Sequence, residues 1–397
     1  MLVQFMFKNV LSFKKETILD MTAINAYKEH EYNLITGKQK NNYLKVAAIY
    51  GANASGKSNL HLAMHLFQNI ILESLENVSK KDDLAIKKYY QPYSFDQDKE
   101  NSEFQIIIIV GDFEYKYGFE YNDKEIFSEW MYKKSFETNR TSTILERTID
   151  TIKFGASIRS ECESYGEQIP PDTLVLSFFN KLKLKTNIFK EVFSGIMDIL
   201  VEKPDFCENP RFILDFLPNT IDNDKHKLLE FLRAIDTGIS DIYYRETENE
   251  IEMFTKHIGK DGNSYSLSLF NESEGTIKSI ALFILARIAI SNNASMFIDE
   301  LNIKLHPLLL KFITDLFYRE DSNAQLIYTT HDTTLLDKRF FRRDQIWFVQ
   351  KDEYGYSELT ALSDFRIRSD ASFEKDYLAG VYGGIPLIRE FELQAGE

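Results

Sequence analysis

Residues 51–58 read Gly-Ala-Asn-Ala-Ser-Gly-Lys-Ser, and this octapeptide constrains the fold more than any other part of the chain. It follows an apolar run at 46–50, and the apolar positions 60, 63, 64 and 67 after it recur at helical spacing. A glycine-rich turn between a buried strand and a helix N-terminus is the arrangement that holds phosphate groups on backbone N–H donors. The pattern therefore predicts a phosphate-binding loop in an α/β fold.

Each residue type in this loop suits the binding of ATP and Mg²⁺. Gly51 and Gly56 let the chain wrap with its N–H groups pointing inward. Lys57 is expected to bridge the β- and γ-phosphates and so to act in catalysis, and Ser58 is expected to offer its hydroxyl to Mg²⁺. The other predicted nucleotide contacts are Ala52, Asn53, Ala54, Ser55 and Asn59. The alternative is a Gly-Lys-Ser helix cap that binds no ligand.

Two later segments carry residues that would complete a site for ATP hydrolysis. An apolar strand at 295–298 ends in Asp299 and Glu300. Asp299 is expected to hold Mg²⁺, and Glu300 to orient and deprotonate the attacking water. His331 follows a strand predicted at 325–328 and is expected to hydrogen-bond the γ-phosphate or that water. Each motif alone is a weak signal, and their order after the phosphate loop strengthens the prediction.

Ser273, Gly275 and Thr276 precede a long apolar helix predicted over 275–291. Serine and threonine are favoured helix caps, so a purely structural role explains them. The functional interpretation is that Ser273 and the Gly275 backbone N–H contact a γ-phosphate. Both interpretations can hold together, because the helix begins at this point.

The remaining patterns predict a mixed sheet, an antiparallel β subdomain and an inserted helical lobe. Alternating residues indicate strands near 3–7 and 17–21 and a three-stranded meander over 104–134. The pattern is helical from 172 to 237, and strands are expected again at 239–245 and 265–270. Because the phosphate loop and Asp299 lie far apart in the sequence, we predict one discontinuous nucleotide-binding domain. Its two ATPase lobes are expected at 1–160 and 263–397, with a mainly helical lobe inserted at 161–262.

Composition limits the kinds of partner that the chain is expected to have. The net charge of −14 argues against a protein that coats nucleic acid through a generally basic surface. Two short basic stretches, at 181–185 and 338–343, are interpreted as solvated faces rather than DNA sites. No apolar run approaches membrane-spanning length. The two cysteines, Cys162 and Cys207, lack metal-type spacing, which favours a reducing cytoplasm.

The order of phosphate loop, Ser-x-Gly-Thr, Asp-Glu and His resembles that of the ABC-type ATPases, in particular their SMC/RecF-like branch. The opening residues 7–13 are similar to that branch's first strand. More narrowly, the chain resembles the bacterial AAA family ATPases of the RloA and AbiL abortive-infection type. The residues that carry this resemblance are 50–60, 275–276, 299–300, 305–307, 329–332, 344–348 and 377–386. The segment 273–276 departs from the Leu-Ser-Gly-Gly form of the ABC signature.

The resemblance implies a P-loop ABC-type ATPase head that dimerises on ATP and hydrolyses it to ADP and phosphate. Each shared site would join Lys57, Ser58, Asp299, Glu300 and His331 of one subunit to Ser273 and Gly275 of the other. Residues 301–307 would lie at the subunit interface by the same analogy. Gln91 is a candidate for the loop glutamine of these ATPases, although a turn residue before Pro92 explains it more simply.

Three functions remain open at this stage. The favoured one is a cytoplasmic switch, without membrane association, that senses phage infection and controls a separate toxic effector protein encoded nearby. The first alternative is a RecF-type repair ATPase that binds nucleic acid directly. The second is a nuclease hidden within 172–260, where Asp215, Asp222 and Asp224 are also explained as solvated loop residues.

Overall fold

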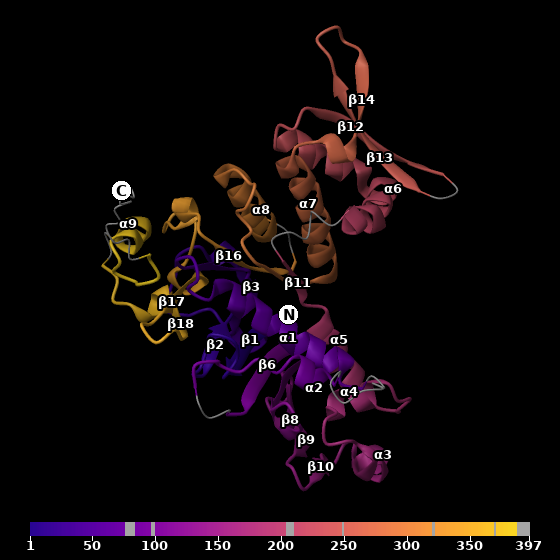
Figure 1. The fold of residues 1–397 in the computed structure, drawn as a ribbon, viewed down its shortest axis with the longest axis vertical. Coiled ribbons are helices and arrows are strands. Elements are labelled where there is room, and N and C mark those ends of the chain that lie inside the picture. The colour runs from indigo at the N-terminus through magenta and orange to yellow at the C-terminus, as the bar shows by residue number, and fades with distance from the viewer. Residues whose placement is uncertain are drawn as a thin grey trace, which may run out of the picture.

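The computed structural model describes residues 1–75, 84–96, 100–203, 210–247, 250–319, 322–368 and 371–386. Two large sheets, with helices between and around them, form the body of the molecule, and a small third sheet projects from one end (Figure 1). Cys162 is buried, and burial raises the pKa of its thiol to about 11. Cys207 lies outside the described residues. In the described part of the chain, no helix is both long enough and apolar enough to cross a bilayer.

The first large sheet has seven strands, all antiparallel to their neighbours, in the order β10-β9-β8-β7-β6-β1-β2. The strands are β1 (Leu2–Lys8), β2 (Thr17–Asp20), β6 (Ser102–Val110), β7 (Phe113–Tyr121), β8 (Ile126–Ser135), β9 (Thr141–Arg147) and β10 (Ile152–Phe154). The predicted meander is confirmed as β6 to β8. The sequence prediction missed β9 and β10, because β9 opens with three exposed polar residues rather than with an apolar alternation.

The second large sheet has six strands in the order β11-β15-β16-β5-β17-β18, and only β18 runs antiparallel. The strands are β5 (Val46–Tyr50), β11 (Leu200–Glu202), β15 (Ser295–Ile298), β16 (Gln325–Thr330), β17 (Ile346–Lys351) and β18 (Ser357–Ala361). Every residue of β5, β15 and β16 is buried, which explains their continuous apolar runs. This sheet confirms the mixed sheet that the sequence predicts.

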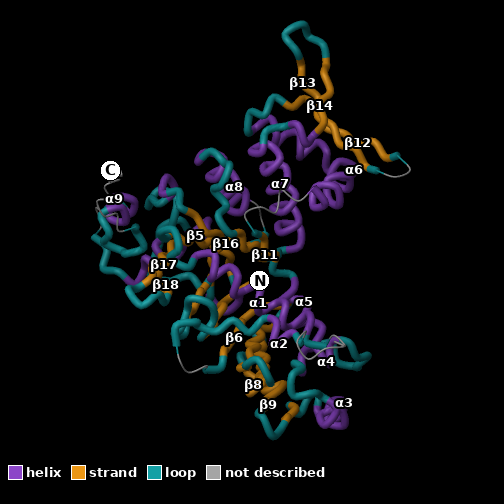
Figure 2. The backbone as a smooth tube through the Cα atoms, viewed as in Figure 1, coloured by secondary structure: helices purple, strands orange, loops and turns teal. Residues whose placement is uncertain are grey.

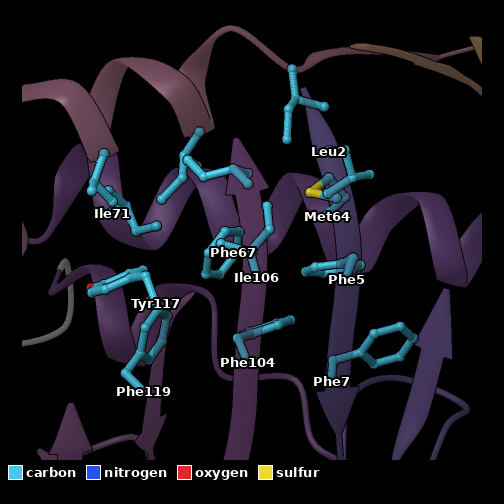
Figure 3. Close-up of a cluster of buried hydrophobic side chains, with 14 of the residues drawn as sticks. Leu2, Phe5, Phe7, Met64, Phe67, Ile71, Phe104, Ile106, Tyr117 and Phe119 are labelled. Carbon is cyan, nitrogen blue, oxygen red and sulfur yellow. The ribbon is translucent and has the colours of Figure 1, made fainter. Parts of the chain in front are cut away.

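Helix α1 (Lys57–Glu73) packs against the antiparallel sheet through an aromatic core (Figure 3). Phe67 of α1 lies 5.7 Å from Phe5 and 5.6 Å from Phe104, measured between ring centroids. The same core includes Ala47 and Ile49 of β5, so α1 is held between the two large sheets. Helices α2 (Ala85–Lys88), α3 (Arg159–Cys162), α4 (Val175–Asn180) and α5 (Ile188–Met197) also contribute buried residues to this core.

A second core covers the other face of the six-stranded sheet. It joins Val46 and Ala48 of β5 to α6 (Pro210–Ala234), α7 (Glu274–Asn292), α8 (Pro307–Arg319) and α9 (Phe373–Leu378). The projecting sheet, β12 (Ile239–Glu246), β13 (Ile251–Ile258) and β14 (Ser264–Ser268), lies at the far end of α6 and α7 (Figure 2). The two short strands β3 (Leu34–Thr36) and β4 (Asn42–Leu44) form a fourth sheet.

The segment 161–262 contains α4, α5 and α6, as predicted, and it also contains β13, which the sequence analysis missed. Its helices are divided between the two cores, since α4 and α5 join the first and α6 joins the second. The division into lobes at 1–160, 161–262 and 263–397 stays a prediction.

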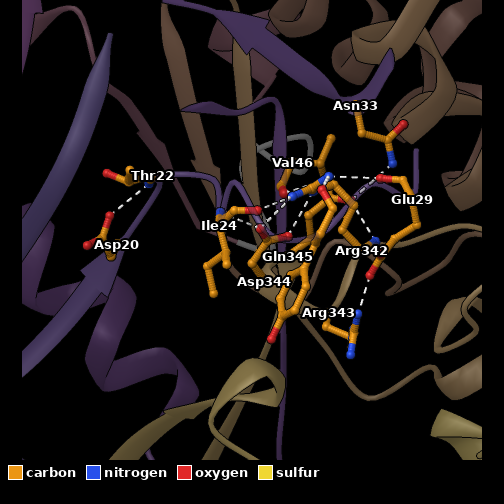
Figure 4. A network of polar contacts seen from close by, with 11 residues as sticks. Asp20, Thr22, Ile24, Glu29, Asn33, Val46, Arg342, Arg343, Asp344 and Gln345 are labelled. Carbon is orange, nitrogen blue, oxygen red and sulfur yellow. Dashed lines mark hydrogen bonds and ion pairs between the residues drawn. The ribbon is translucent and has the colours of Figure 1, made fainter. Parts of the chain in front are cut away.

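The basic stretch at 338–343 is not uniformly solvated. Arg342 is fully buried, and its guanidinium donates to both oxygens of Asp344, at 2.9 and 2.8 Å (Figure 4). It also donates to the backbone carbonyl oxygens of Ile24, Tyr27 and Glu29. Arg342 therefore fixes the segment 24–29 to the turn that precedes β17, and for this residue the solvated interpretation was wrong.

Candidate nucleotide site

The predicted motifs meet at one edge of the six-stranded sheet. β5 leads into the phosphate loop, β16 pairs with β5, and β15 pairs with β16. Asp299 and Glu300 follow β15 directly, and His331 follows β16. Because these three strands are parallel, their carboxyl ends lie at the same edge, which is where open α/β sheets bind ligands.

The phosphate loop adopts a conformation that requires its second glycine. Gly56 has φ +115°, in the left-handed region, and Ala54 has φ +60°. A Cβ atom on Gly56 would lie 2.3 Å from Ser357 Oγ, so a side chain at this position would clash as well as strain the backbone. Helix α1 begins at Lys57, immediately after this turn, and its N-terminal N–H groups face the loop.

Lys57 is the charged residue at the centre of the loop, and only 4 % of its surface is exposed. Its Nζ donates to the carbonyl oxygens of Gly51, at 2.8 Å, and of Ala52, at 3.0 Å, and it lies 3.4 Å from His331 Nδ1. Burial lowers the pKa of Lys57 to about 8, although Glu300 and the neighbouring aspartate act in the opposite direction. The ammonium group is therefore held where an anion would stabilise its charge.

The two acids after β15 are held differently. Asp299 is buried, and Thr329 Oγ1 donates to its Oδ1 at 2.5 Å. The Glu300 N–H donates to the same Thr329 oxygen at 2.7 Å, and Glu300 has φ +47°. This left-handed turn brings Glu300 Oε1 to 3.4 Å from His331 Nε2. The pKa of His331 is lowered by burial and then by Lys57, which favours the neutral imidazole.

A cavity of about 410 Å³ joins Lys57, Glu300 and His331, whereas Asp299 does not line it. Its lining residues are Asn53, Ala54, Ser55, Gly56, Lys57, Ser58, Asn59, Glu300, His331 and Lys351. Nine of these ten were predicted from the sequence as site residues. Lys351, at the end of β17, was missed, because nothing in its local sequence indicates that its strand pairs with β5.

Ser273, Gly275 and Thr276 do not line this cavity. Ser273 is exposed at the N-terminus of α7, where its Oγ accepts a hydrogen bond from the Thr276 N–H at 3.1 Å. Gly275 lies against the segment after β15, since a Cβ on it would be 3.0 Å from the Lys304 carbonyl oxygen. Within one chain, these three residues form a helix cap, as the structural interpretation of the sequence expected.

The residues of the cavity fit a nucleotide with Mg²⁺. Ser55 Oγ is buried and has no hydrogen-bond partner in the described part of the chain, and a Cβ on Gly51 would lie 2.6 Å from it. That oxygen and the surrounding N–H groups suit a phosphate. Ser58 and Asp299 would hold Mg²⁺, which usually takes one or two protein oxygens and completes its shell with phosphate and water. No cluster of three or more His, Cys, Asp and Glu side chains among the described residues could hold a metal alone.

A family model described as "AAA domain, putative AbiEii toxin, Type IV TA system" matches residues 46–337 of the chain. This span begins with β5, includes the phosphate loop, and extends past Asp299, Glu300 and His331. The chain belongs to this family. The narrower resemblance to the RloA and AbiL type stays a prediction.

Comparison of the AAA-domain protein with curated protein sequences gives no match. Among solved structures, it is similar to an SMC head bound to the C-winged helix domain of ScpA, with 17% identity and a TM-score of 0.43, over 94% of this chain and 99% of that one. It is similar to the SMC head domain from Thermotoga maritima, with 11% identity and a TM-score of 0.41, over 92% and 99% of the two chains. A third is the Pyrococcus furiosus Smc head domain with an extended coiled coil, bound to the C-terminal domain of ScpA, with 15% identity, a TM-score of 0.41 and coverage of 96% and 99%.

A buried relay of hydroxyl groups supports the loop from behind, and the sequence analysis missed it. Ser357 Oγ donates to the Ser55 carbonyl oxygen at 2.6 Å and lies 2.8 Å from Ser12 Oγ. Ser12 Oγ also accepts from Asn59 Nδ2 at 2.8 Å. A hydroxyl carries one proton, so donation by Ser357 to Ser55 leaves Ser12 to donate to Ser357. Ser357 in β18 and Ser12 in the turn before β2 thus hold the phosphate loop in place through Ser55 and Asn59.

A second cavity, of about 620 Å³, adjoins the first and shares Asn59 and Lys351 with it. Its lining includes the aromatic side chains of Tyr90, Tyr93 and Phe95. Phe95 is 72% exposed and lies 5.5 Å from the Tyr93 ring, between centroids. Gln91, the weak candidate for a loop glutamine, lines this second cavity rather than the one that contains Lys57.

Proposed function

We propose that this AAA-domain protein binds and hydrolyses ATP with Mg²⁺ and that ATP drives the association of two copies. The observation that carries this proposal is that Lys57, Glu300 and His331, from three separate segments, line one cavity with the phosphate loop. This combination of a buried cation, a carboxylate and an imidazole at a helix N-terminus fits the stabilisation of a transferring phosphoryl group.

The chain's own residues suggest a division of roles. Lys57 would leave the two carbonyl oxygens that it contacts and neutralise phosphate charge. Glu300, whose Oε1 lies 3.4 Å from His331 Nε2, would orient and deprotonate water. His331, which lines the cavity, would sense the terminal phosphate. Its turn is held by Asn302, whose Oδ1 accepts from the His331 backbone N–H at 3.4 Å and from Thr330 Oγ1 at 2.9 Å. Bound Mg²⁺ would supply further charge stabilisation at Ser58 and Asp299.

The position of Ser273, Gly275 and Thr276 supports the shared-site proposal. They lie at an exposed helix N-terminus outside the cavity of their own chain, and such an N-terminus favours anions. In a head-to-head dimer, these residues of one subunit would complete the phosphate site of the other. Asn302 belongs to the segment 301–307 proposed for the interface, so subunit contact would reach His331 directly.

We place the base of the nucleotide in the second cavity. The cavity adjoins the phosphate site through Asn59 and Lys351, and Phe95 offers an exposed ring next to it. Stacking of a base on an aromatic side chain contributes about 1–3 kcal/mol. This arrangement would let the loop hold the phosphates while Phe95 holds the base.

The proposed cellular role is an ATP-dependent switch in antiviral defence, in the cytoplasm, that controls a separate effector protein. The support for it is the resemblance to abortive-infection ATPases, together with a family description that names a toxin system. A RecF-type role in DNA repair is the alternative, and the net charge of −14 disfavours it.

The deciding experiment compares wild type, Lys57→Ala and Glu300→Gln for ATP binding, hydrolysis and mass by light scattering, with and without DNA. We expect Lys57→Ala to lose ATP binding and Glu300→Gln to bind ATP without turnover and to accumulate as a dimer. Glu353→Gln, an exposed acid in the β17–β18 turn, is the matched control and should behave as wild type. Tight ATP binding by Lys57→Ala would remove the central proposal, and strong stimulation by DNA would favour the repair role.

A mixing experiment tests the shared site. Lys57→Ala and Ser273→Arg subunits are each expected to be inactive alone, and a mixture should regain activity because each heterodimer retains one intact site. Failure to regain activity would show that a site is complete within one chain.

A further inference from the structure

Lys351 lines both cavities of the candidate nucleotide site. The cavity that contains Lys57 and the cavity that contains Phe95 share two lining residues, Asn59 and Lys351. A nucleotide with its phosphates in the first cavity and its base in the second passes the place where these two residues lie. The part of the nucleotide that connects phosphates and base is the ribose with its α-phosphate, so this part would lie beside Lys351.

The register of β17 explains why Lys351 reaches the phosphate loop. The parallel pairing of β5 with β17 ends at Tyr50 and Phe348, so β17 continues past the end of β5, beside the loop. Side chains alternate between the two faces of a strand, and Lys351 therefore shares a face with Val349. Val349 belongs to the core that contains α1, and its carbonyl oxygen would lie 2.5 Å from a Cβ on Gly51. Lys351 is thus on the α1 side of the sheet, next to the loop.

Two other segments hold this end of β17 in place. Lys351 pairs with Ser357 of β18, and Ser357 Oγ donates to a carbonyl oxygen of the phosphate loop at 2.6 Å. A Cβ on Gly384 would lie 3.3 Å from a carbonyl oxygen of β17, so the motif at 377–386, which the sequence analysis singled out, packs against this strand. The backbone of Lys351 therefore has a fixed position relative to the loop, while its side chain is exposed and can reach a ligand.

The charge of Lys351 is available to a ligand. Its ammonium group forms no hydrogen bond or ion pair with any residue that the structure describes. Two carboxylates line the cavities, and each has another partner. Asp96 Oδ2 lies 2.6 Å from Lys14 Nζ, and Glu300 Oε1 lies 3.4 Å from His331 Nε2. An unmatched cation at the junction of the two cavities suits a phosphate oxygen.

Asn59 faces the same junction with a different chemistry. Its Nδ2 donates to Ser12 Oγ at 2.8 Å, so its amide oxygen can accept a hydrogen bond from a ligand. A ribose carries hydroxyl donors, and the adjacent α-phosphate carries negatively charged oxygens. The junction therefore presents an acceptor and a cation, which match neighbouring parts of one nucleotide.

We propose that Lys351 binds the α-phosphate of the nucleotide. This inference rests on the proposed function and adds a contact that does not involve the terminal phosphate. Lys57 and His331 would act on the phosphates that are cleaved or released, whereas the α-phosphate is present both before and after hydrolysis. Lys351 would therefore contribute equally to the affinity for ATP and to the affinity for ADP.

The first test measures the Kd for ATP and for ADP by isothermal titration in wild type, Lys351→Met and Lys351→Arg. We expect Lys351→Met to raise both Kd values by about tenfold and by the same factor, because each complex loses a charge-assisted contact to phosphate. Lys351→Arg, which retains the charge, should recover most of the affinity. Lys183→Met, which replaces an exposed lysine outside both cavities, is the matched control and should bind as wild type.

A second measurement separates a direct contact from a general loss of structure. The two diastereomers of ATPαS differ only in which non-bridging oxygen of the α-phosphate is replaced by sulfur. A cation that contacts one of these oxygens makes the affinities of the two diastereomers differ. We expect the wild type to distinguish them and Lys351→Met to lose most of the difference. Equal affinities in the wild type, or an unchanged ratio in Lys351→Met, would overturn the α-phosphate contact.

The outcomes distinguish a failure of this inference from a failure of the proposed function. If Lys57→Ala loses ATP binding while Lys351→Met stays within about twofold of the wild type, the role of Lys351 is refuted and the ATPase proposal stands. If Lys57→Ala retains tight ATP binding, the proposed function itself fails. A loss in Lys351→Met that affects ATP but not ADP would place this lysine at the terminal phosphate and overturn the assignment.

Discussion

Removal of one buried hydroxyl group behind the phosphate loop should weaken ATP binding although it touches no nucleotide. Ser357 is 2% exposed, and its Oγ donates to the Ser55 carbonyl oxygen at 2.6 Å and lies 2.8 Å from Ser12 Oγ. In Ser357→Ala, the carbonyl loses its donor and the Ser12 hydroxyl loses its acceptor. A buried polar group left without a partner costs about 1–3 kcal/mol. We therefore expect the free energy of unfolding to fall by about 1–3 kcal/mol.

Part of this loss should appear in the affinity for ATP, because Ser55 belongs to the loop and Ser12 contacts Asn59 next to it. If about 1.4 kcal/mol is spent on reordering the loop, the Kd for ATP rises about tenfold. The assays are isothermal titration with ATP and urea denaturation of the same samples. Ser363→Ala, a half-buried serine in the short helix after β18, is the matched control. A Kd for Ser357→Ala within twofold of the wild type would refute the positioning role of the relay.

Three further predictions concern the base, the loop lysine and the buried arginine. Phe95→Ala should raise the Kd for ATP by about tenfold, since stacking of the base contributes about 1–3 kcal/mol. The Kd for inorganic triphosphate, which has no base, should stay unchanged. An equal loss of affinity for both ligands would contradict a base site. The pKa of Lys57 is about 8 in the ligand-free protein, and an anion favours its charged form, so ATP affinity should weaken as pH rises above about 8. Lys57→Arg should make ATP affinity less dependent on pH. A wild-type affinity that does not change with pH would exclude titration of Lys57. Arg342→Met should lower the free energy of unfolding by about 3–5 kcal/mol, because it leaves the buried Asp344 carboxylate without its cationic partner. Arg339→Met should change the free energy of unfolding little, and the two midpoints of urea denaturation give the comparison.

The secondary structure was predictable where one local pattern dominates. The strands β5, β15 and β16 appear in the sequence as short apolar runs, α1 as a segment with apolar residues at helical spacing, and α7 as a long, almost continuous apolar segment. Prediction failed at β13 and β18, whose residues are mixed in polarity because one side of each strand is only partly covered. For such strands, partners distant in the sequence decide the structure.

The sequence by itself determined the phosphate loop and the two motifs that follow it. In residues 51–58, the glycines allow the tight turn of the loop, and the helix begins directly after it. Asp299 and Glu300 follow one buried strand directly, and His331 follows another. These residues meet at one edge of the sheet because β15, β16 and β5 pair in parallel, and parallel strands end at the same edge.

Only the tertiary structure decided which other residues surround the loop. Ser12 and Ser357 lie 345 positions apart in the sequence yet form one relay, and Lys351 reaches the cavity because β17 pairs with β5. Arg342, in a run of basic residues, is buried because Asp344 and three backbone carbonyl groups surround it. The physical reason is that burial and hydrogen bonding depend on neighbours in space. A residue whose partners come from distant segments therefore carries no local signal of its environment.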